Sequence, residues 1–157
     1  NTMTTLTFVD KKLVDSPLVG PNGAVYYTTT TTHGFRGRKI TTIMAGSGLV
    51  GTINWREKTF IINGVQRKWS DLRSGHFSAW PARKWTWGNG TYELKWHHMQ
   101  KELATSEHGG DTVRFTTYEP HLFHNNSQAT IYFPQNMQDE IERMFLLMAV
   151  LQTEMHK

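Results

Sequence analysis

Short runs in which apolar and polar residues alternate occupy most of the chain. Leu6 and Phe8, separated by threonine, form the first such pair. Alternation with a period of two is typical of a strand that buries one face. Strands are therefore expected in residues 4–10, 24–32, 39–45, 49–55, 59–63, 65–69, 83–87, 91–96, 99–105, 112–119 and 128–133.

Turn residues separate these runs at short, even intervals. Asn63-Gly64 suits a two-residue type I′ hairpin turn, and Gly88-Asn89-Gly90 joins two aromatic strands in the clearest hairpin of the sequence. The tract from Thr28 to Thr32 has low complexity, but its β-branched side chains favour an exposed strand over disorder. The pattern indicates an all-β architecture of ten or so strands.

The last part of the chain changes period. Residues 144–151 are eight consecutive apolar residues, within a predicted helix over 136–155. Asn136 is the expected N-cap, and acidic residues fill the first turns, where the helix dipole favours negative charge. A helix without a polar side must be surrounded, and this run is shorter than the ~20 residues that cross a bilayer. We expect the preceding sheet to enclose it.

Together these elements predict one domain over residues 1–157, with no internal repeat and no boundary. The expected fold class is mainly β: a single antiparallel β-barrel of about 10–12 strands that encloses a C-terminal hydrophobic α-helix. Closure would remove exposed strand edges, and the helix would fill the interior. We expect a monomer with no transmembrane segment.

The composition predicts a cellular compartment and excludes catalysis by thiols. The chain has no cysteine, so thiol catalysis and disulfides are excluded, and no signal peptide is visible; a cytoplasmic location is expected. His121 and His124 could hold zinc with a third ligand, but no zinc motif accompanies them. We therefore expect no metal site and no cofactor.

Charge is polarised along the chain, although the net charge is only +4. Residues 36–101 hold twelve Lys or Arg against three acids, a local balance of +9, whereas residues 102–157 have a balance of −5. Such a distribution favours a basic face that attracts RNA, DNA, anionic lipid or an acidic protein. An ordinary basic surface without a partner is the alternative.

Several motifs, in their order along the chain, resemble a known family. They are Gly23-Ala24-Val25-Tyr26-Tyr27, Gly51-Thr52-Ile53-Asn54-Trp55, Ile61-Ile62-Asn63-Gly64, the stretch 87–96 and the closing helix. The chain resembles DUF6593, a fungal family of unknown function in the tubby C-terminal-like superfamily, which includes phospholipid scramblase and the LURP-one-related proteins. That resemblance implies a barrel wrapped around a hydrophobic helix. It implies no catalytic residues, and the phosphoinositide-binding residues of tubby cannot be aligned here.

Aromatic and basic residues interleave on the hairpin 83–96, as in proteins that stack bases of single-stranded nucleic acid and pair its phosphates. The alternative is that the aromatic rows face the core and only the cations are exposed. A basic glycine loop at 34–38 could bind phosphate as well. The candidate RNA- or anion-binding residues are Arg36, Arg38, Lys39, Arg83, Lys84, Trp85, Trp87, Lys95 and His97.

Residues suited to RNA chemistry lie on the same hairpin and farther along the chain. Base removal needs an aromatic ring, a cation and a carboxylate, and strand cleavage needs an acid and a base. The candidate catalytic residues are Tyr92, Glu93, Arg114, Tyr118, Glu119 and His121.

Three functions remain open from the sequence. The first is a small basic fungal protein that binds or acts on RNA, in the form of a ribosome-directed toxin with rRNA N-glycosylase or ribonuclease-like activity. The second is a tubby-like module that binds phosphoinositides or other anionic lipids without catalysis. The third is an interaction or ligand-carrying domain. The interleaved tryptophans favour RNA or the ribosome as the partner.

Overall fold

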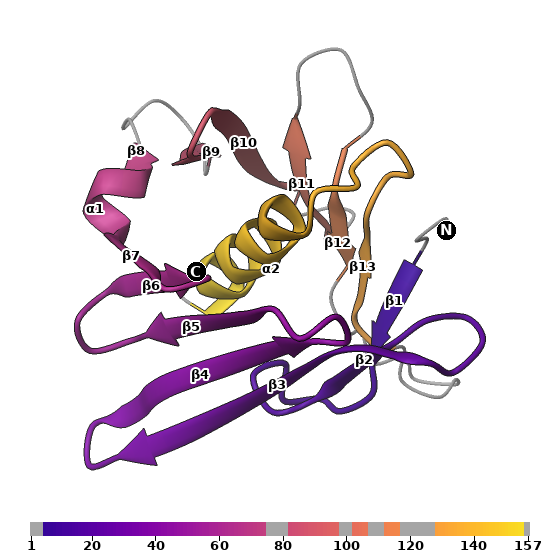
Figure 1. The fold of residues 1–157 in the computed structure, drawn as a ribbon, viewed down its shortest axis with the longest axis horizontal. Helices are drawn as coiled ribbons and strands as arrows, with labels where there is room; N and C mark the ends of the chain where they lie inside the picture. The colour runs from indigo at the N-terminus through magenta and orange to yellow at the C-terminus, as the bar shows by residue number, and fades with distance from the viewer. Residues whose placement is uncertain (1–4, 75–81, 98–101, 107–111, 117–127, 156–157) are drawn as a thin grey trace.

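The computed structural model describes residues 5–74, 82–97, 102–106, 112–116 and 128–155. Thirteen strands and two helices make up this part of the chain (Figure 1). They are β1 (Thr5–Phe8), β2 (Pro17–Val19), β3 (Val25–Gly34), β4 (Gly37–Ala45), β5 (Val50–Asn54), β6 (Thr59–Ile62), β7 (Val65–Lys68), α1 (Trp69–Leu72), β8 (Arg73–Ser74), β9 (Ala82–Trp87), β10 (Gly90–His97), β11 (Glu102–Ser106), β12 (Arg114–Thr116), β13 (Thr130–Tyr132) and α2 (Glu140–Met155).

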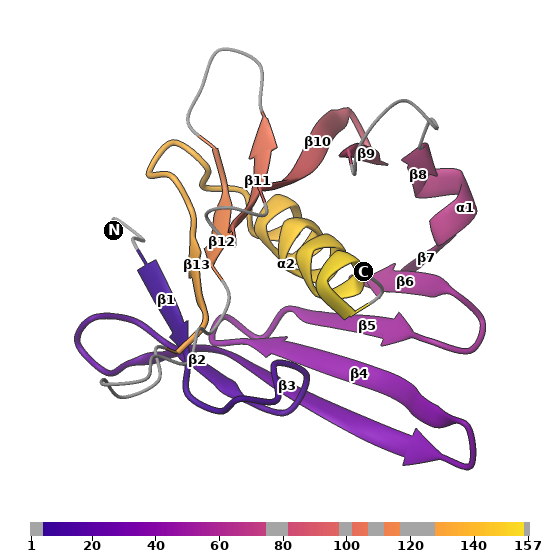
Figure 2. The same cartoon turned by 180° about the vertical axis from the view of Figure 1, so that it is seen from behind.

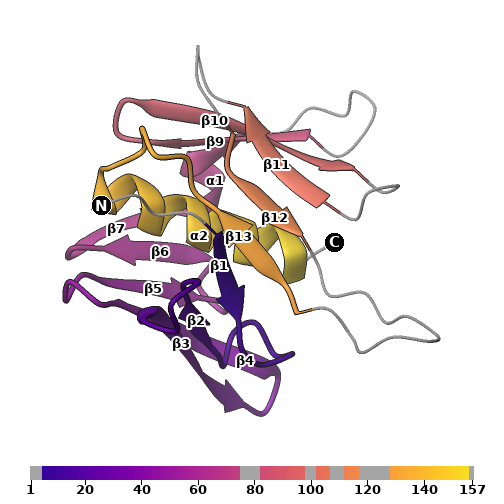
Figure 3. The same ribbon diagram turned by 90° about the vertical axis from the view of Figure 1, so that its right-hand side faces the viewer.

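All thirteen strands belong to one antiparallel sheet, in the order β7-β6-β5-β4-β3-β2-β1-β13-β12-β11-β10-β9-β8. Within β1–β7 and within β8–β13 each strand pairs with the next in sequence, and the first strand also pairs with the last, with Leu6 opposite Ile131. The sheet is therefore a continuous meander that curls around α2, as Figures 2 and 3 show from behind and from the side.

The closed barrel of about 10–12 strands is not what the described residues form. The sheet ends at β7 and β8, and no ladder joins these two strands. Helix α1 lies between them and turns Trp69 and Leu72 into the core, so β7 stops at Lys68 and β8 is only two residues long. All four side chains of β7 are exposed, as expected of an edge strand. The mainly β architecture with a C-terminal helix is confirmed.

Helix α2 lies inside the curve of the sheet, and residues 143–152 are all buried. It begins at Glu140 rather than near residue 136, so Asn136 as the N-cap is wrong. The cap is Asp139, whose carboxylate accepts hydrogen bonds from the backbone N–H groups of Ile141 (2.8 Å) and Glu142 (3.1 Å). Those are the second and third residues of the helix, the donors that an N-cap side chain satisfies.

Aromatic rings hold the helix against both halves of the sheet. Phe60 of β6 stacks on Trp85 of β9 at 5.4 Å, and Phe145 of α2 packs 6.2 Å from each of them. Trp69 of α1 contacts Phe60 edge-on at 5.9 Å. Rings therefore connect the two edges of the sheet where backbone hydrogen bonds do not.

The fold requires glycine at two positions, one in a tight turn and one where the helix packs against the sheet. At the β6–β7 turn, Asn63 and Gly64 both have positive φ (51° and 79°), which confirms the predicted type I′ signal. On β5, a Cβ added to Gly51 would come within 2.7 Å of the Met144 sulfur and 2.8 Å of the Met148 sulfur. The absence of a side chain at Gly51 lets α2 approach the sheet.

Candidate nucleic-acid interface

Three connections of the meander lie at the same end of the sheet: β3–β4, β5–β6 and β7–α1–β8. In an antiparallel meander every second connection returns to the same end, which is on the left in Figure 1. Two contacts show that they are adjacent. A Cβ on Gly34, at the β3–β4 tip, would overlap the guanidinium of Arg56. The N–H of Trp69 in α1 donates to the carbonyl of Lys58 at 2.9 Å.

Most of the cations between residues 36 and 73 gather at or near these connections. Eight Lys or Arg residues fall in this span, against the two acids Glu57 and Asp71. We call the eight cations the basic rim: Arg36, Arg38, Lys39, Arg56, Lys58, Arg67, Lys68 and Arg73. Six of them are exposed, and Arg38 and Arg73 are half-buried.

Some of the rim arginines lie over aromatic rings. Arg38 lies over the ring of Trp55 at 4.7 Å, and Arg67 lies over Trp87 at 5.9 Å. An ion pair joins Lys95 to Glu93 at 3.2 Å, outside the rim. The positive charge of the rim is therefore not cancelled by ion pairs within the described part of the chain.

Arg73 lies on edge strand β8, beside the break in the sheet, and a second positive charge lies close to it. Its guanidinium lies over Trp85 at 5.6 Å and donates a long hydrogen bond of 3.4 Å to the Gln152 side chain near the end of α2. Burial lowers the pKa of Arg73, and the positive charge of Arg83 lowers it further. Two arginines thus repel one another at this edge, an arrangement that an anion would stabilise.

Phe35 stands at the tip of the β3–β4 hairpin with its side chain fully exposed. Beside it is a hollow of about 440 Å³ that Phe35, Arg36 and Arg56 line. A large apolar side chain in water is unusual, because such rings are normally buried. The tip combines a ring for stacking or insertion with cations for phosphate.

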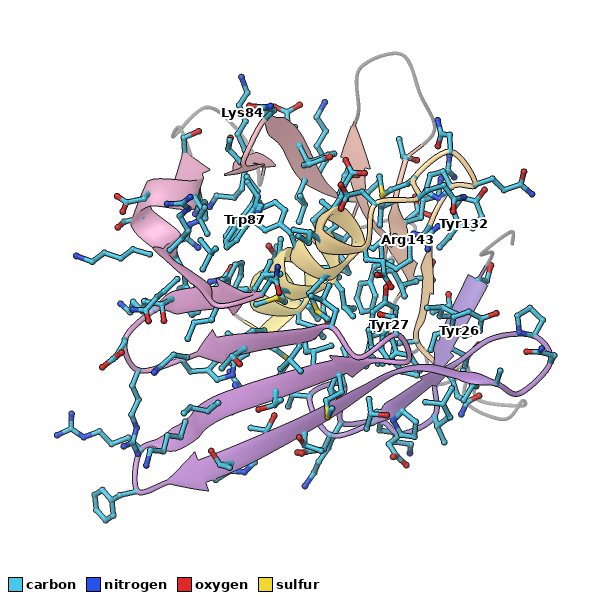
Figure 4. All side chains as sticks on the ribbon, in the orientation of Figure 1. Tyr26, Tyr27, Lys84, Trp87, Tyr132 and Arg143 are labelled. Carbon is cyan, nitrogen blue, oxygen red and sulfur yellow. The ribbon has the colours of Figure 1, made fainter. Side chains whose placement is uncertain are left out.

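The structure separates the predicted anion-binding residues into two groups. Arg36, Arg38 and Lys39 belong to the basic rim, whereas Arg83, Lys84 and Lys95 are exposed on the β9–β10 hairpin. Figure 4 shows Lys84 on the outside of the molecule and Trp87 directed toward the interior. The side chain of His97 lies outside the described part.

Trp85 as a base-stacking residue is wrong, because its side chain has no exposed surface. Its ring stacks on Phe60, meets Phe145 edge-on and lies under the Arg73 guanidinium. Trp87 is half-buried and packs 5.5 Å from Phe145. These residues fit the alternative interpretation of the hairpin, in which the aromatic row faces the core and the cations face outward.

The described part of the predicted catalytic set does not form a constellation. Tyr92 is buried with its ring 6.5 Å from Phe145, while its neighbour Glu93 faces the other side of the sheet and pairs with Lys95. Arg114 is exposed on β12, two strands from β10. Tyr118, Glu119 and His121 lie outside the described residues. Among the residues that are described, no three His, Asp or Glu side chains are grouped to hold a metal ion.

Five rim residues and one ring were not predicted as site residues: Arg56, Lys58, Arg67, Lys68, Arg73 and Phe35. The sequence contained a usable signal for them. Once the strands are assigned as a meander, connections two strands apart must share an end of the sheet, and their charges add there. Composition counted over a linear segment does not show this grouping.

Comparison with known proteins assigns the chain to a family without assigning an activity. Searches of curated proteins and of solved structures found no match. Neither helix in the described part of the chain has the length and apolarity needed to cross a membrane. A family model described as a family of unknown function, DUF6593, matches residues 11–151. The chain therefore belongs to the DUF6593 family.

Proposed function

We propose that this protein binds single-stranded RNA through the basic rim. The observation that carries the proposal is that eight cations lie at or near three connections at one end of the sheet, with the fully exposed ring of Phe35 at the tip of one of them beside Arg36 and Arg56. Phosphates would neutralise the cations, and bases would stack on Phe35. Each stacked base contributes about 1–3 kcal/mol in proteins of this kind.

The rim suits an extended polyanion better than a single small anion. Its cations are distributed over the β3–β4, β5–β6 and β7–α1–β8 connections rather than focused on one point. Neutralising several phosphates at once releases condensed counterions, which makes binding strongly dependent on salt. Single strands are favoured over duplexes because a projecting ring can reach only unpaired bases.

We extend the proposal to the ribosome as the target, in the cytoplasm of a fungal cell or of an organism that meets the protein. The support is the basic rim and the absence of cysteine, which suits a reducing compartment. Base removal or strand cleavage would draw on Tyr118, Glu119 and His121, since the buried Tyr92 and the paired Glu93 do not serve it. Intact ribosomes incubated with the protein, with and without aniline, separate base removal, strand cleavage and inertness on one RNA gel.

Binding itself is tested by fluorescence anisotropy of a labelled single-stranded RNA of about twelve nucleotides. The double variant Arg36→Glu/Arg56→Glu should lose most of the affinity, and Phe35→Ala should lose about tenfold. Matched controls are Lys12→Glu, an exposed cation of the β1–β2 connection, and Val25→Ala, an exposed apolar residue of β3. Equal affinity of the rim variants and the controls would reject the rim as the RNA site.

A second candidate is docking to anionic phospholipid, which Phe35 also favours. An apolar side chain at a hairpin tip with flanking cations can enter the headgroup region while Arg36 and Arg56 meet lipid phosphates. The thirteen-stranded sheet around a C-terminal helix supports a tubby-like relationship, although fold alone does not carry function. Sedimentation with neutral vesicles and with vesicles containing phosphatidylserine or phosphoinositides tests it. Equal retention on both would reject it.

A further inference from the structure

A pocket of about 450 Å³ lies at the end of the sheet opposite the basic rim. Its walls are the start of β3, the β4–β5 connection and the first turns of α2. Connections β3–β4 and β4–β5 lie at opposite ends of the meander, so this pocket is separate from the rim. Its lining includes Tyr26, Tyr27, Gly46, Ser47, Glu140 and Arg143.

Arg143 is the unusual member of this lining. It stands at the start of the buried run of α2, and its side chain is only 8 % exposed. Its Nε donates to the backbone carbonyl of Met137, but its Nη2 is buried without a hydrogen-bond partner. Arginine is rarely this buried unless its charge is paired, because an unpartnered buried donor destabilises the fold. A group that completes its hydrogen bonding is expected.

Tyr27 contributes a second polar group beside the arginine. Its side chain is 5 % exposed, and burial raises the pKa of the phenol to about 12. The Arg143 charge opposes this rise and the Glu140 charge adds to it, so both charges act on the phenol. Tyr27 therefore remains a neutral hydroxyl that can donate a hydrogen bond. Figure 4 shows Tyr27 and Arg143 between α2 and the sheet, away from Lys84 and Trp87.

The charges around the pocket select among anions. Glu140 lines it and is exposed, and burial raises the pKa of nearby Glu142 while the charge of Arg143 lowers it. Within the described residues, neither acid forms an ion pair with Arg143. These two carboxylates disfavour a dianion such as phosphate, whereas one carboxylate matches the planar donor fork of a guanidinium. The remaining walls (Val25, Tyr26 and Ala45) suit an apolar body.

We propose that this pocket binds a small organic monocarboxylate, with the carboxylate on Arg143 and the apolar part against Tyr26. The volume lies within the ~300–1,000 Å³ range of small-molecule sites. Because the pocket is separate from the rim, this proposal does not rest on RNA binding, and either can fail without the other.

The test is NMR titration of the isotopically labelled protein with benzoate, and with benzamide and inorganic phosphate as comparison probes. Benzoate should shift the backbone amide signals of Gly46 and Ser47 and the Arg143 Nε–H signal in a saturable manner, at concentrations up to about 20 mM. Benzamide and phosphate should bind at least about tenfold more weakly. Equal binding of benzamide would overturn the charge recognition, and equal binding of phosphate would overturn the monocarboxylate class.

Variants locate the site. Arg143→Lys keeps the charge but loses the fork and should weaken benzoate binding about tenfold, while Arg143→Met should abolish it. Since Arg143→Met removes a contact to Met137 and can unfold the helix start, Ser47→Trp is the second variant. It fills the mouth from an exposed turn residue. Lys12→Met removes one positive charge, as Arg143→Met does, but at an exposed position. This control should bind benzoate as the wild type does. Unchanged binding in both Arg143→Lys and Ser47→Trp would overturn the proposal.

Discussion

The guanidinium of Arg67 lies over the indole of Trp87, with 5.9 Å between Cζ and the ring centroid. Arg67 belongs to edge strand β7, and Trp87 belongs to β9, on the other side of the break in the sheet. Trp87 in turn packs on Phe145 of the central helix. Side chains therefore join the two edges where the backbone ladder stops.

This relationship predicts a measurable coupling. Arg67→Ala should lower the free energy of unfolding by about 0.5–1 kcal/mol, the usual contribution of a cation–π pair at a partly exposed site. Urea denaturation of Arg67→Ala, Trp87→Leu and the double variant measures the coupling energy. If the two single variants changed the free energy of unfolding in a strictly additive way, the contact between Arg67 and Trp87 would not stabilise the fold. Arg114→Ala, an exposed arginine outside the rim, is the matched control.

Substitution of Gly51 should destabilise the packing of α2 on β5. In Gly51→Val, the new side chain meets the Met144 and Met148 sulfurs at less than van der Waals distance. Overpacking of this kind costs about 1–3 kcal/mol. The control is Gly46→Ala, where the nearest atom to an added Cβ is a carbonyl oxygen at an ordinary 3.5 Å. Equal denaturation midpoints for the two variants would contradict the close helix approach.

The start of the helix offers a paired test. Asp139→Ala removes the acceptor for the Ile141 and Glu142 N–H groups and should cost about 1 kcal/mol. Asn136→Ala, three residues earlier, should leave the free energy of unfolding nearly unchanged. Thermal unfolding followed by circular dichroism ranks the two variants. A larger loss in Asn136→Ala would restore the boundary predicted from sequence.

Alkaline pH should destabilise the protein through Tyr27. Burial raises the pKa of its phenol from 10.0 to about 12, so the folded state favours the neutral form. The resulting stabilisation is complete below pH 10 and is lost as the pH rises toward 12, by roughly 2–3 kcal/mol. Urea denaturation across this interval should show a steeper decline in wild type than in Tyr27→Phe. Parallel declines of the two proteins would show that folding does not raise the pKa of Tyr27.

The sequence predicted the fold more fully than the site, for a physical reason. Period-two alternation and turn signals identify strands locally, and Asn63-Gly64 and the 83–96 hairpin are confirmed on that basis. The closure of the sheet depends on α1, where Trp69 and Leu72 read as part of a strand and a loop until their burial is known. The predicted start of the C-terminal helix was wrong because Asn136 and Asp139 are both good N-cap residues. Only the tertiary structure determines which of them caps the helix.

The candidate site depended on relationships that linear reading does not contain. Successive residues of the hairpin were predicted to alternate between faces, and they do, but the sequence left open whether the face that carries Trp85 is buried, as the structure shows it to be. The rim combines residues from three connections up to 37 positions apart, from Arg36 to Arg73. Arg143 lies beside an apolar run, and nothing in its spacing reveals an unpartnered nitrogen.

Salt dependence of RNA affinity tests the basic rim most directly. A rim that contacts about five phosphates predicts a slope of about −3.5 for log K against log salt concentration with single-stranded RNA. The Arg36→Glu/Arg56→Glu variant should bind far more weakly, with a slope smaller in magnitude by roughly 1.4, while Lys12→Glu should match the wild type. A wild-type slope near zero, or the same slope and affinity in the rim variant, would contradict RNA binding at the rim.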